Sequence, residues 1–454
     1  MSSSELPVTR AEVRRAAEAV LDHPGADAVE VVIGAASSGV TRYAGSEIIQ
    51  NIARDELQAF VRVVVGDRAA SAATNQLDAG HMTTAAGAAL EAARASLPDP
   101  DFPGLPSPAE VGEATPVGRW DDDTAAASPA QRAEAVKEIV AATAAGAAAG
   151  IYETGAHAWA VISSEGIDCF DAFTRCVMTC LADVGDATGW GDDSSHALSE
   201  VDAAGAARRA IAKAEASRGA TDAEPGSYDV VLEPVAAGTL LDYLSYAGFG
   251  AKQMLEGESF FAERRGQGVA DPSVTIVDDV RHPRSVGIGF DFEGLPRQRV
   301  AVIDGGVATG PVSDLRSARK LGEPPTGHSS GSTEFGAYAA NIIMEPGHQD
   351  LEELIAGVEE GFLVTRFHYV NILDRPTTLL TGMTRDGTFR ISGGEVAGPV
   401  RNFRFAQSVL EALANVRGVG RDLVALAPEF GSFGSTAAPA LRVDGFHFAS
   451  TTSH

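Results

Sequence analysis

The sequence predicts an α+β protein in two parts, and three observations carry this prediction. Helical periodicity and strand-like alternation both occur within residues 1–225, separated by polar turns. From residue 226 onward, short β-type runs rich in glycine dominate and helical patterns are few. The chain has 454 residues, a length typical of two to three domains. We therefore predict an N-terminal α/β sandwich-like domain (1–225), a sheet with packed helices, and a mostly-β, barrel-like C-terminal domain (226–454).

The first elements follow from capping signals and apolar periodicity. Thr9 and Glu12 form a Thr-x-x-Glu capping box that opens an amphipathic helix, and the Pro-Gly pair at 24–25 ends it. A second helix is expected near 77–97. Between these helices, apolar runs predict strands of a mixed or antiparallel sheet at 28–33, 48–53 and 57–65.

The rest of the N-terminal part begins with a proline-rich connection. Six prolines within 98–116 predict an extended segment, not a helix or strand. A Ser-Pro pair at 128–129 opens a helix, and Ser199 caps another that ends at Gly219. Two long strands are expected between these helices, at 156–163 and 167–184.

The C-terminal part contains few helical patterns, which lie at 235–244, 350–359 and 406–415. We place the domain boundary near Pro225, where the sequence changes to short, glycine-rich β-type runs. The motif Gly287-x-Gly289 lies in a β-rich loop and does not open a helix, which disfavours dinucleotide binding.

Composition excludes several classes of function. The formal net charge of −27 argues against binding nucleic acid or an anionic membrane through bulk charge. No window approaches roughly 20 uncharged apolar residues, and the first residues lack a signal-type apolar run, so we expect a soluble cytoplasmic protein. Cys169, Cys176 and Cys180 miss the Cys-x-x-Cys zinc spacing and are expected to be small buried thiols in a reducing compartment.

Histidines provide the candidate ligands, although none forms a helical i, i+4 pair. His328 lies in a polar loop between Gly327 and two serines, and binding and structural roles are equally open there. His368 occupies an alternating strand at 364–371 and fits packing or an interface. Asp350 precedes an apolar residue and has Glu353 three residues on, which favours a helix cap over metal ligation by His348-Gln349-Asp350. His447, between two phenylalanines, is expected to pack.

Several strings in order resemble one family, the TldD/TldE (PmbA) metallopeptidases, and its TldE/PmbA branch in particular. The resemblance extends over nearly the whole chain. The strings that carry it are Arg42-Tyr43-Ala44 with Ile48-Ile49-Gln50-Asn51, Gly226 to Leu232, Phe290-Asp291-Phe292-Glu293-Gly294, Ser317-Ala318 with Thr326-Gly327-His328, Gly361 to Thr365, and Gly393 to Val400.

This resemblance implies a zinc-type peptidase built from two related subunits. The TldD-like subunit would carry a His-Glu-x-x-x-His segment and a Cys ligand near its C-terminus, so zinc or a similar divalent metal is expected in that partner. In this chain the alignment puts Asp242 and Tyr243 at the His-Glu positions and Ala247 at the second His. No Cys follows Cys180, so the resemblance implies a metal-free chain without catalytic residues.

The leading hypothesis is a metal-free TldE-like subunit that pairs with a TldD-like catalytic chain and admits unfolded peptides to a shared cavity. A second hypothesis is a stand-alone homodimeric peptide-binding or maturation factor, and a third is an enzyme whose relocated metal site uses His328, His348 or His368. The Gly-bearing loop and the alternating strand place the expected substrate- or partner-binding residues on the cavity or partner face. These residues are Thr326, Gly327, His328, His368 and Asn371.

Overall fold

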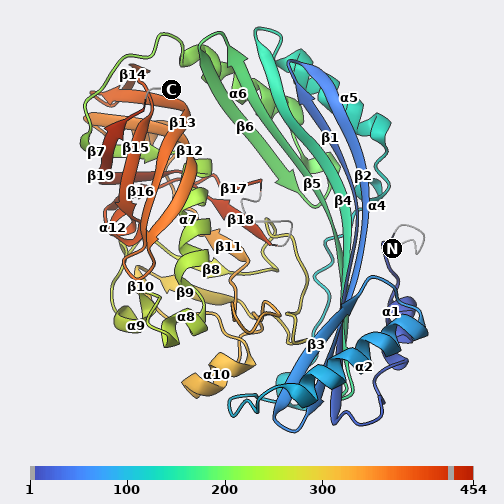
Figure 1. Cartoon of the computed structure of the whole chain (residues 1–454). Helices are drawn as coiled ribbons and strands as arrows, with labels where there is room; N and C mark the ends of the chain where they lie inside the picture. Colours follow the sequence, from blue (N-terminus) through green and yellow to red (C-terminus); the bar gives the residue numbers. More distant parts are fainter. Residues whose placement is uncertain (1–5, 428–433, 453–454) are drawn as a thin grey trace.

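A computed structural model describes residues 6–427 and 434–452 and shows two parts side by side (Figure 1). The N-terminal part contains a six-stranded antiparallel sheet with the strand order β3-β2-β1-β4-β5-β6. Its strands are β1 (Ala28–Ala44), β2 (Glu47–Val65), β3 (Arg68–Thr74), β4 (Ala147–Ser163), β5 (Asp168–Val184) and β6 (Ala187–Ser195).

The strands of this sheet are longer than the sequence predicts. The runs 48–53 and 57–65 are one strand, β2, and the run 28–33 is the start of β1, which continues to Ala44. In β2, pairing continues through residues 54–56 although they are exposed, because exposed strand segments need no apolar alternation. In the added part of β1, buried and more exposed side chains alternate, and Thr41 and Tyr43 are buried.

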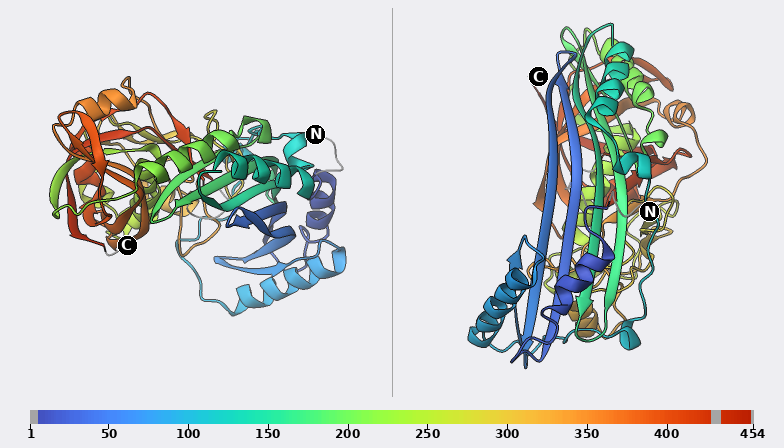
Figure 2. Two further views of the ribbon diagram at one scale, coloured as in Figure 1. Left: turned by 90° about the horizontal axis from the view of Figure 1, so that it is seen from above. Right: turned by 90° about the vertical axis from the view of Figure 1, so that its right-hand side faces the viewer.

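Four helices pack on one face of the sheet (Figure 2). They are α1 (Arg10–Glu18), α2 (Ala79–Ala95), α5 (Pro129–Ala142) and α6 (Ala203–Ala216). The expected Thr9–Glu12 capping box is present on α1. The expected cap at Ser199 is wrong: Ser199 belongs to the short 3-10 helix η1 (Leu198–Glu200), and the Asp202 side chain caps α6 by accepting from Gly205 N at 2.8 Å.

The proline-rich segment 98–116 connects α2 to the second half of the sheet without contributing a strand. Its single helical turn is α3 (Pro108–Val111), and α4 (Asp122–Ala125) follows before α5. No helix in the described part of the chain is both long enough and apolar enough to cross a membrane.

A closed ring of strands confirms the barrel-like character expected of the C-terminal part. Strand β7 pairs with β12 and β19, and the ring closes through β15, β13 and a second pairing of β13 with β12. The strands of this sheet are β7 (Gly226–Leu232), β12 (Glu360–Asp374), β13 (Leu379–Ser392), β14 (Glu395–Pro399), β15 (Phe403–Ser408), β16 (Val416–Val419) and β19 (Leu441–Thr451).

A second, smaller sheet lies beside this barrel, and helix α7 (Pro234–Gly248) packs between them within one continuous apolar core. The strands of the smaller sheet are β8 (Ile276–Asp278), β9 (Val300–Asp304), β10 (Val307–Ala308), β11 (Asn341–Met344), β17 (Val424–Ala425) and β18 (Ser435–Ala438). The remaining helices are α8 (Ala251–Leu255), α9 (Phe261–Arg264), α10 (Leu315–Leu321), α11 (Leu351–Ala356) and α12 (Val409–Ala414). The sequence predicts α7, α11 and α12 but misses the short helices α8 to α10.

The face of the N-terminal sheet opposite the helices packs against the C-terminal part. Val161 and Phe173 of this face share an apolar cluster with Ile288 and Phe290. The three cysteines confirm the alternation of β5, because Cys176 and Cys180 face the helices whereas Cys169 lies in the interdomain cluster, and all are free and buried. The interdomain contact therefore involves the face of the sheet that is opposite the helices, at strands β4 and β5.

Candidate functional site

Helix α7 carries the three positions at which the resemblance places metal ligands. The Thr436 hydroxyl of β18 donates a hydrogen bond to Asp242 Oδ1. The Tyr243 hydroxyl donates to the carbonyl oxygen of Val370 in β12 at 2.7 Å. Ala247 is fully buried. All three positions thus contribute to packing between α7 and its two neighbouring sheets.

These residues do not fit a zinc ion. Zinc sites in proteins use three or four Cys, His or carboxylate ligands. Only Asp242 belongs to that group, and its carboxylate already binds Thr436. Across residues 6–427 and 434–452, no three His, Cys, Asp or Glu side chains gather in a way that could hold a metal ion.

Strand β12 bends where Tyr243 contacts it. The pairing of β12 with β13 shifts register between His368 and Asn371, and Tyr369 has a left-handed φ of 50°. The strict alternation expected for 364–371 is therefore wrong: Phe367 and Val370 are both buried, whereas Tyr369 is 69% exposed. A bulge inserts one residue into the strand, so the side chains beyond it change faces.

The bulge places two of the predicted binding residues near α7. Asn371 is exposed, and its side-chain amide donates to the carbonyl oxygen of Tyr369 at 3.2 Å. His368 is half-buried, and burial together with Arg366 and Arg385 lowers the pKa of its imidazole. Ligand or partner binding by these two residues stays a prediction.

The polar loop that contains His328 is not exposed at this residue, because the fold buries Gly327 and His328. His328 has no exposed surface; its Nε2 lies 3.0 Å from Asp278 Oδ1 and its Nδ1 lies 2.9 Å from Thr326 Oγ1. Gly327 has φ 73°, and a side chain there would collide with the carbonyl oxygen of Pro296. Thr326 and His328 make hydrogen bonds within the protein. Substrate or partner binding by Thr326, Gly327 and His328 stays a prediction.

The carboxylates of Asp278 and Asp242 both raise the pKa of one tyrosine, Tyr338. Burial raises the pKa of Asp278, but His328 and Arg297 outweigh burial, so this pKa lies below its ordinary value. Burial and the carboxylates of Asp242 and Asp278 raise the pKa of Tyr338, which therefore stays protonated. The pKa of Tyr338 is thus affected both by Asp242 of α7 and by Asp278, which contacts His328.

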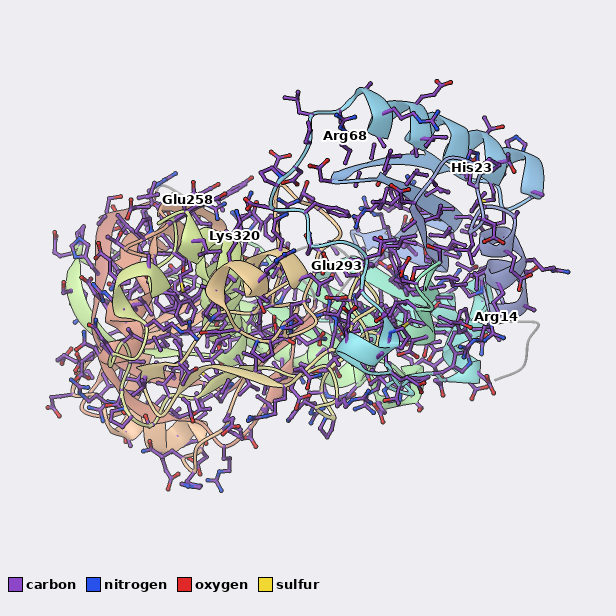
Figure 3. The ribbon with its side chains drawn as sticks, turned by 90° about the horizontal axis from the view of Figure 1, so that it is seen from below. Arg14, His23, Arg68, Glu258, Glu293 and Lys320 are labelled. Carbon is purple, nitrogen blue, oxygen red and sulfur yellow. The ribbon has the colours of Figure 1, made fainter. Side chains whose placement is uncertain are left out.

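A second cluster of buried charge joins the two parts of the chain, and sequence reasoning missed its role. Glu30 of β1 is 1% exposed, and Arg62 Nη1 lies 3.1 Å from its Oε1. Burial raises the pKa of Glu30, and Asp291 raises it further. Glu293, labelled in Figure 3, accepts a hydrogen bond from Leu315 N at 3.0 Å.

Burial, Asp291 and Asp314 raise the pKa of Glu293 well above its ordinary value. Two signals could have revealed this cluster. Glu30 interrupts an apolar run on a strand, and Asp291-Phe292-Glu293 already stood out as part of a family string.

The structure confirms the helix cap expected at Asp350 and corrects the role expected of His447. Asp350 caps α11 with Glu353, as expected, and the neighbouring His348 is exposed. The packing role expected of His447 is wrong: the side chain is exposed and its Nδ1 lies 3.2 Å from Ser227 Oγ. Its two phenylalanine neighbours are buried because alternate residues of β19 face opposite sides.

Comparison with known proteins defines the class of the C-terminal part. Residues 225–450 match the model of the PmbA/TldA metallopeptidase C-terminal domain. A metalloprotease of Methanothermobacter thermautotrophicus is 29% identical over 202 residues, which are 43% of this chain and 43% of that protein. Through this C-terminal part, the chain belongs to the TldD/TldE (PmbA) metallopeptidase family.

Two further relatives extend the comparison. A zinc metalloprotease TldD homolog of Saccharolobus solfataricus is 25% identical over 214 residues, 43% of this chain and 44% of that protein. The matched segments thus span less than half the length of these relatives. The crystal structure of TldE from Thermococcus kodakarensis shares the fold, with a TM-score of 0.83, 20% identity, and coverage of 97% of this chain and 100% of that one.

Proposed function

We propose that this chain is the metal-free, TldE-like subunit of a TldD/TldE-type metallopeptidase that acts on unfolded peptides in the cytoplasm. A TldD-like partner supplies the zinc or similar metal and the catalytic residues. This chain completes the cavity that limits access to extended substrates. The working form is a heterodimer, and a homodimer forms when the partner is absent.

The observation that carries the proposal is the state of the three α7 positions. If this subunit had lost only one metal ligand, the other ligands of the metal site would still be present on α7. Here Thr436 and Val370 engage Asp242 and Tyr243, and Ala247 is buried in the core. The helix is built for packing, which suits a scaffold subunit.

The comparisons support this choice of subunit. The chain shares its fold with a protein named TldE over nearly the full length of both. The proteins named metalloprotease or TldD homolog align over less than half of their length. Related subunits commonly assemble about a pseudo-twofold axis, which is the arrangement we propose for the complex.

Paired variants in a reconstituted complex test the proposal. The chain is co-expressed with a TldD-like chain that carries His-Glu-x-x-x-His, and EDTA-sensitive casein hydrolysis is measured. Asp242→Asn in this chain keeps an oxygen acceptor for Thr436 and leaves hydrolysis and bound zinc unchanged. Replacing the first His of the partner's motif by Ala abolishes both.

Loss of zinc and of hydrolysis in the Asp242→Asn complex would instead assign metal binding to this chain. Complex formation without any hydrolysis, combined with peptide binding by this chain alone, would favour the stand-alone peptide-binding factor.

A further inference from the structure

Strand β3 pairs with only 7 of the 19 residues of β2, Ala59–Val65, so the preceding residues 47–58 lie at an edge of the sheet. Val65 and Arg68 flank the two-residue turn between β2 and β3, so they form a hydrogen-bonded pair. In an antiparallel sheet, every second residue then directs its N–H and C=O groups to the same edge. Along β2 these residues are Val63, Val61 and Ala59, which β3 pairs.

The same alternation continues beyond the end of β3. Leu57, Asp55, Ala53 and Asn51 direct their backbone groups to this edge, because their neighbours pair with β1 in an unbroken register. Among the described residues, no strand other than β1 pairs with residues 47–58 of β2. Figure 2 shows α2 and β3 beside only the lower part of the sheet edge in its right-hand view.

Most side chains along this free edge are exposed. No residue from 47 to 58 is buried, whereas Ala59, Val61 and Val63 have no exposed surface. Ile48 and Ile49 are 46% and 64% exposed. Proteins usually protect long edges with Lys, Pro or a covering element, and this segment contains neither Lys nor Pro.

The charge of the edge decides between the possible occupants. Glu47, Asp55 and Glu56 outnumber Arg54 on the segment, and Arg42 opposite Gln50 leaves the surface net negative. Arg54 is further occupied by Glu56, with Nη1 and Oε1 3.3 Å apart. A second copy of the chain would bring a net charge of −27 against this surface.

We propose that the free edge of β2, residues 47–58, binds an extended peptide with apolar and basic side chains as an added β-strand. The peptide backbone pairs with Asn51, Ala53, Asp55 and Leu57, as in strand-addition recognition. Its apolar side chains cover Ile48 and Ile49, and its basic side chains face the carboxylates. This inference rests on the proposed function and names a holding site for its peptide substrate.

Binding to the isolated chain tests the edge without the TldD-like partner. The probe is a short capped peptide of alternating valine and lysine with a fluorescent label, and anisotropy reports its binding. One control probe has the same sequence with alternate backbone nitrogens methylated, and the other replaces lysine by glutamate. The first peptide binds, and the two controls bind at least about tenfold more weakly because they lack backbone donors or complementary charge.

Two variants at one position separate the backbone from the side chain. Ala53→Pro removes an N–H that points away from β1, so the sheet folds while the affinity for the valine–lysine peptide falls at least about tenfold. Ala53→Ser retains the N–H and binds as the wild type does. Circular dichroism and Tm confirm that both variants are folded.

Equal binding by wild type and Ala53→Pro, or by the methylated peptide, would overturn the proposal. Self-association in sedimentation that Ala53→Pro abolishes would also overturn it, because the edge would then bind a second copy. Since this assay contains no partner, its failure leaves partner-dependent hydrolysis untouched, and failure of the heterodimer leaves this binding result untouched.

Discussion

Glu293 lies among carboxylates at the contact between the two parts of the chain. Burial, Asp291 and Asp314 all raise its pKa above the ordinary 4.5, whereas the N–H of Leu315 and Arg62 act in the opposite direction. A carboxyl group with a raised pKa in the folded state stabilises the fold only while it is protonated. That contribution is complete below the ordinary pKa and is lost as pH rises through the folded pKa.

We therefore expect Glu293→Gln to raise Tm at pH 8, since the amide mimics the protonated carboxyl and can still accept from Leu315 N. The Tm values of variant and wild type converge near pH 4.5, where both side chains are neutral. Differential scanning calorimetry across this pH range measures the effect. A variant less stable than wild type at pH 8 would show that the charged carboxylate stabilises the contact.

In contrast to the charged carboxylate of Glu293, His328 is expected to stabilise the fold, because its Nε2 contacts the buried carboxylate of Asp278. Its removal leaves Asp278 in the interior with Arg297 and the N–H of Asn341 as its remaining partners. We expect His328→Ala to lower the free energy of unfolding by about 3 kcal/mol. Urea denaturation measures this change, with the exposed His348→Ala as a control expected to stay within about 0.5 kcal/mol. Equal effects of the two variants would contradict a bracing role for His328.

The sequence predicts local residue roles better than distant ones. The Asp350–Glu353 cap was predictable because both partners lie within one helical turn. The pairing of His328 with Asp278 joins residues 50 positions apart, and no local pattern reports such a contact. For the same reason, the loop around His328 reads as polar and accessible although the fold buries it.

At the scale of elements, the N-terminal cap of helix α6 can be tested by comparing Asp202 with Ser199. Asp202 accepts from Gly205 N, whereas Ser199 lies one 3-10 turn earlier. We expect Asp202→Ala to lower the free energy of unfolding by about 1 kcal/mol. Ser199→Ala is the matched control, expected to change it by less than about 0.5 kcal/mol. Chemical denaturation would refute the assignment if Ser199→Ala had the larger effect.

Strand lengths and bulges show where sequence patterns stop being informative. The exposed part of β2 lacks an apolar alternation because both of its faces are in solvent, so periodicity divides one strand into two. The bulge in β12 depends on pairing with β13 and on the contact of Tyr243 with Val370. Neither partner is adjacent in the sequence, and the side-chain faces of 364–371 could not be assigned without them.

At the scale of the whole molecule, the fold class and the barrel follow from the sequence, because many local signals agree over long segments. The contact between the two parts does not. It combines the apolar cluster of Val161, Phe173, Ile288 and Phe290 with the carboxylates near Glu30. Such a surface depends on the position of one part of the sheet relative to loops that lie more than a hundred residues away.

The proposed division of labour between two chains has one direct test. The isolated chain and its mixture with a TldD-like chain are purified by gel filtration, and bound metal and EDTA-sensitive casein hydrolysis are measured for each. We expect the isolated chain to carry no stoichiometric metal and no hydrolytic activity, and the mixture to show both. About one zinc per isolated chain together with EDTA-sensitive hydrolysis would contradict the account, because a complete site would then exist within this chain.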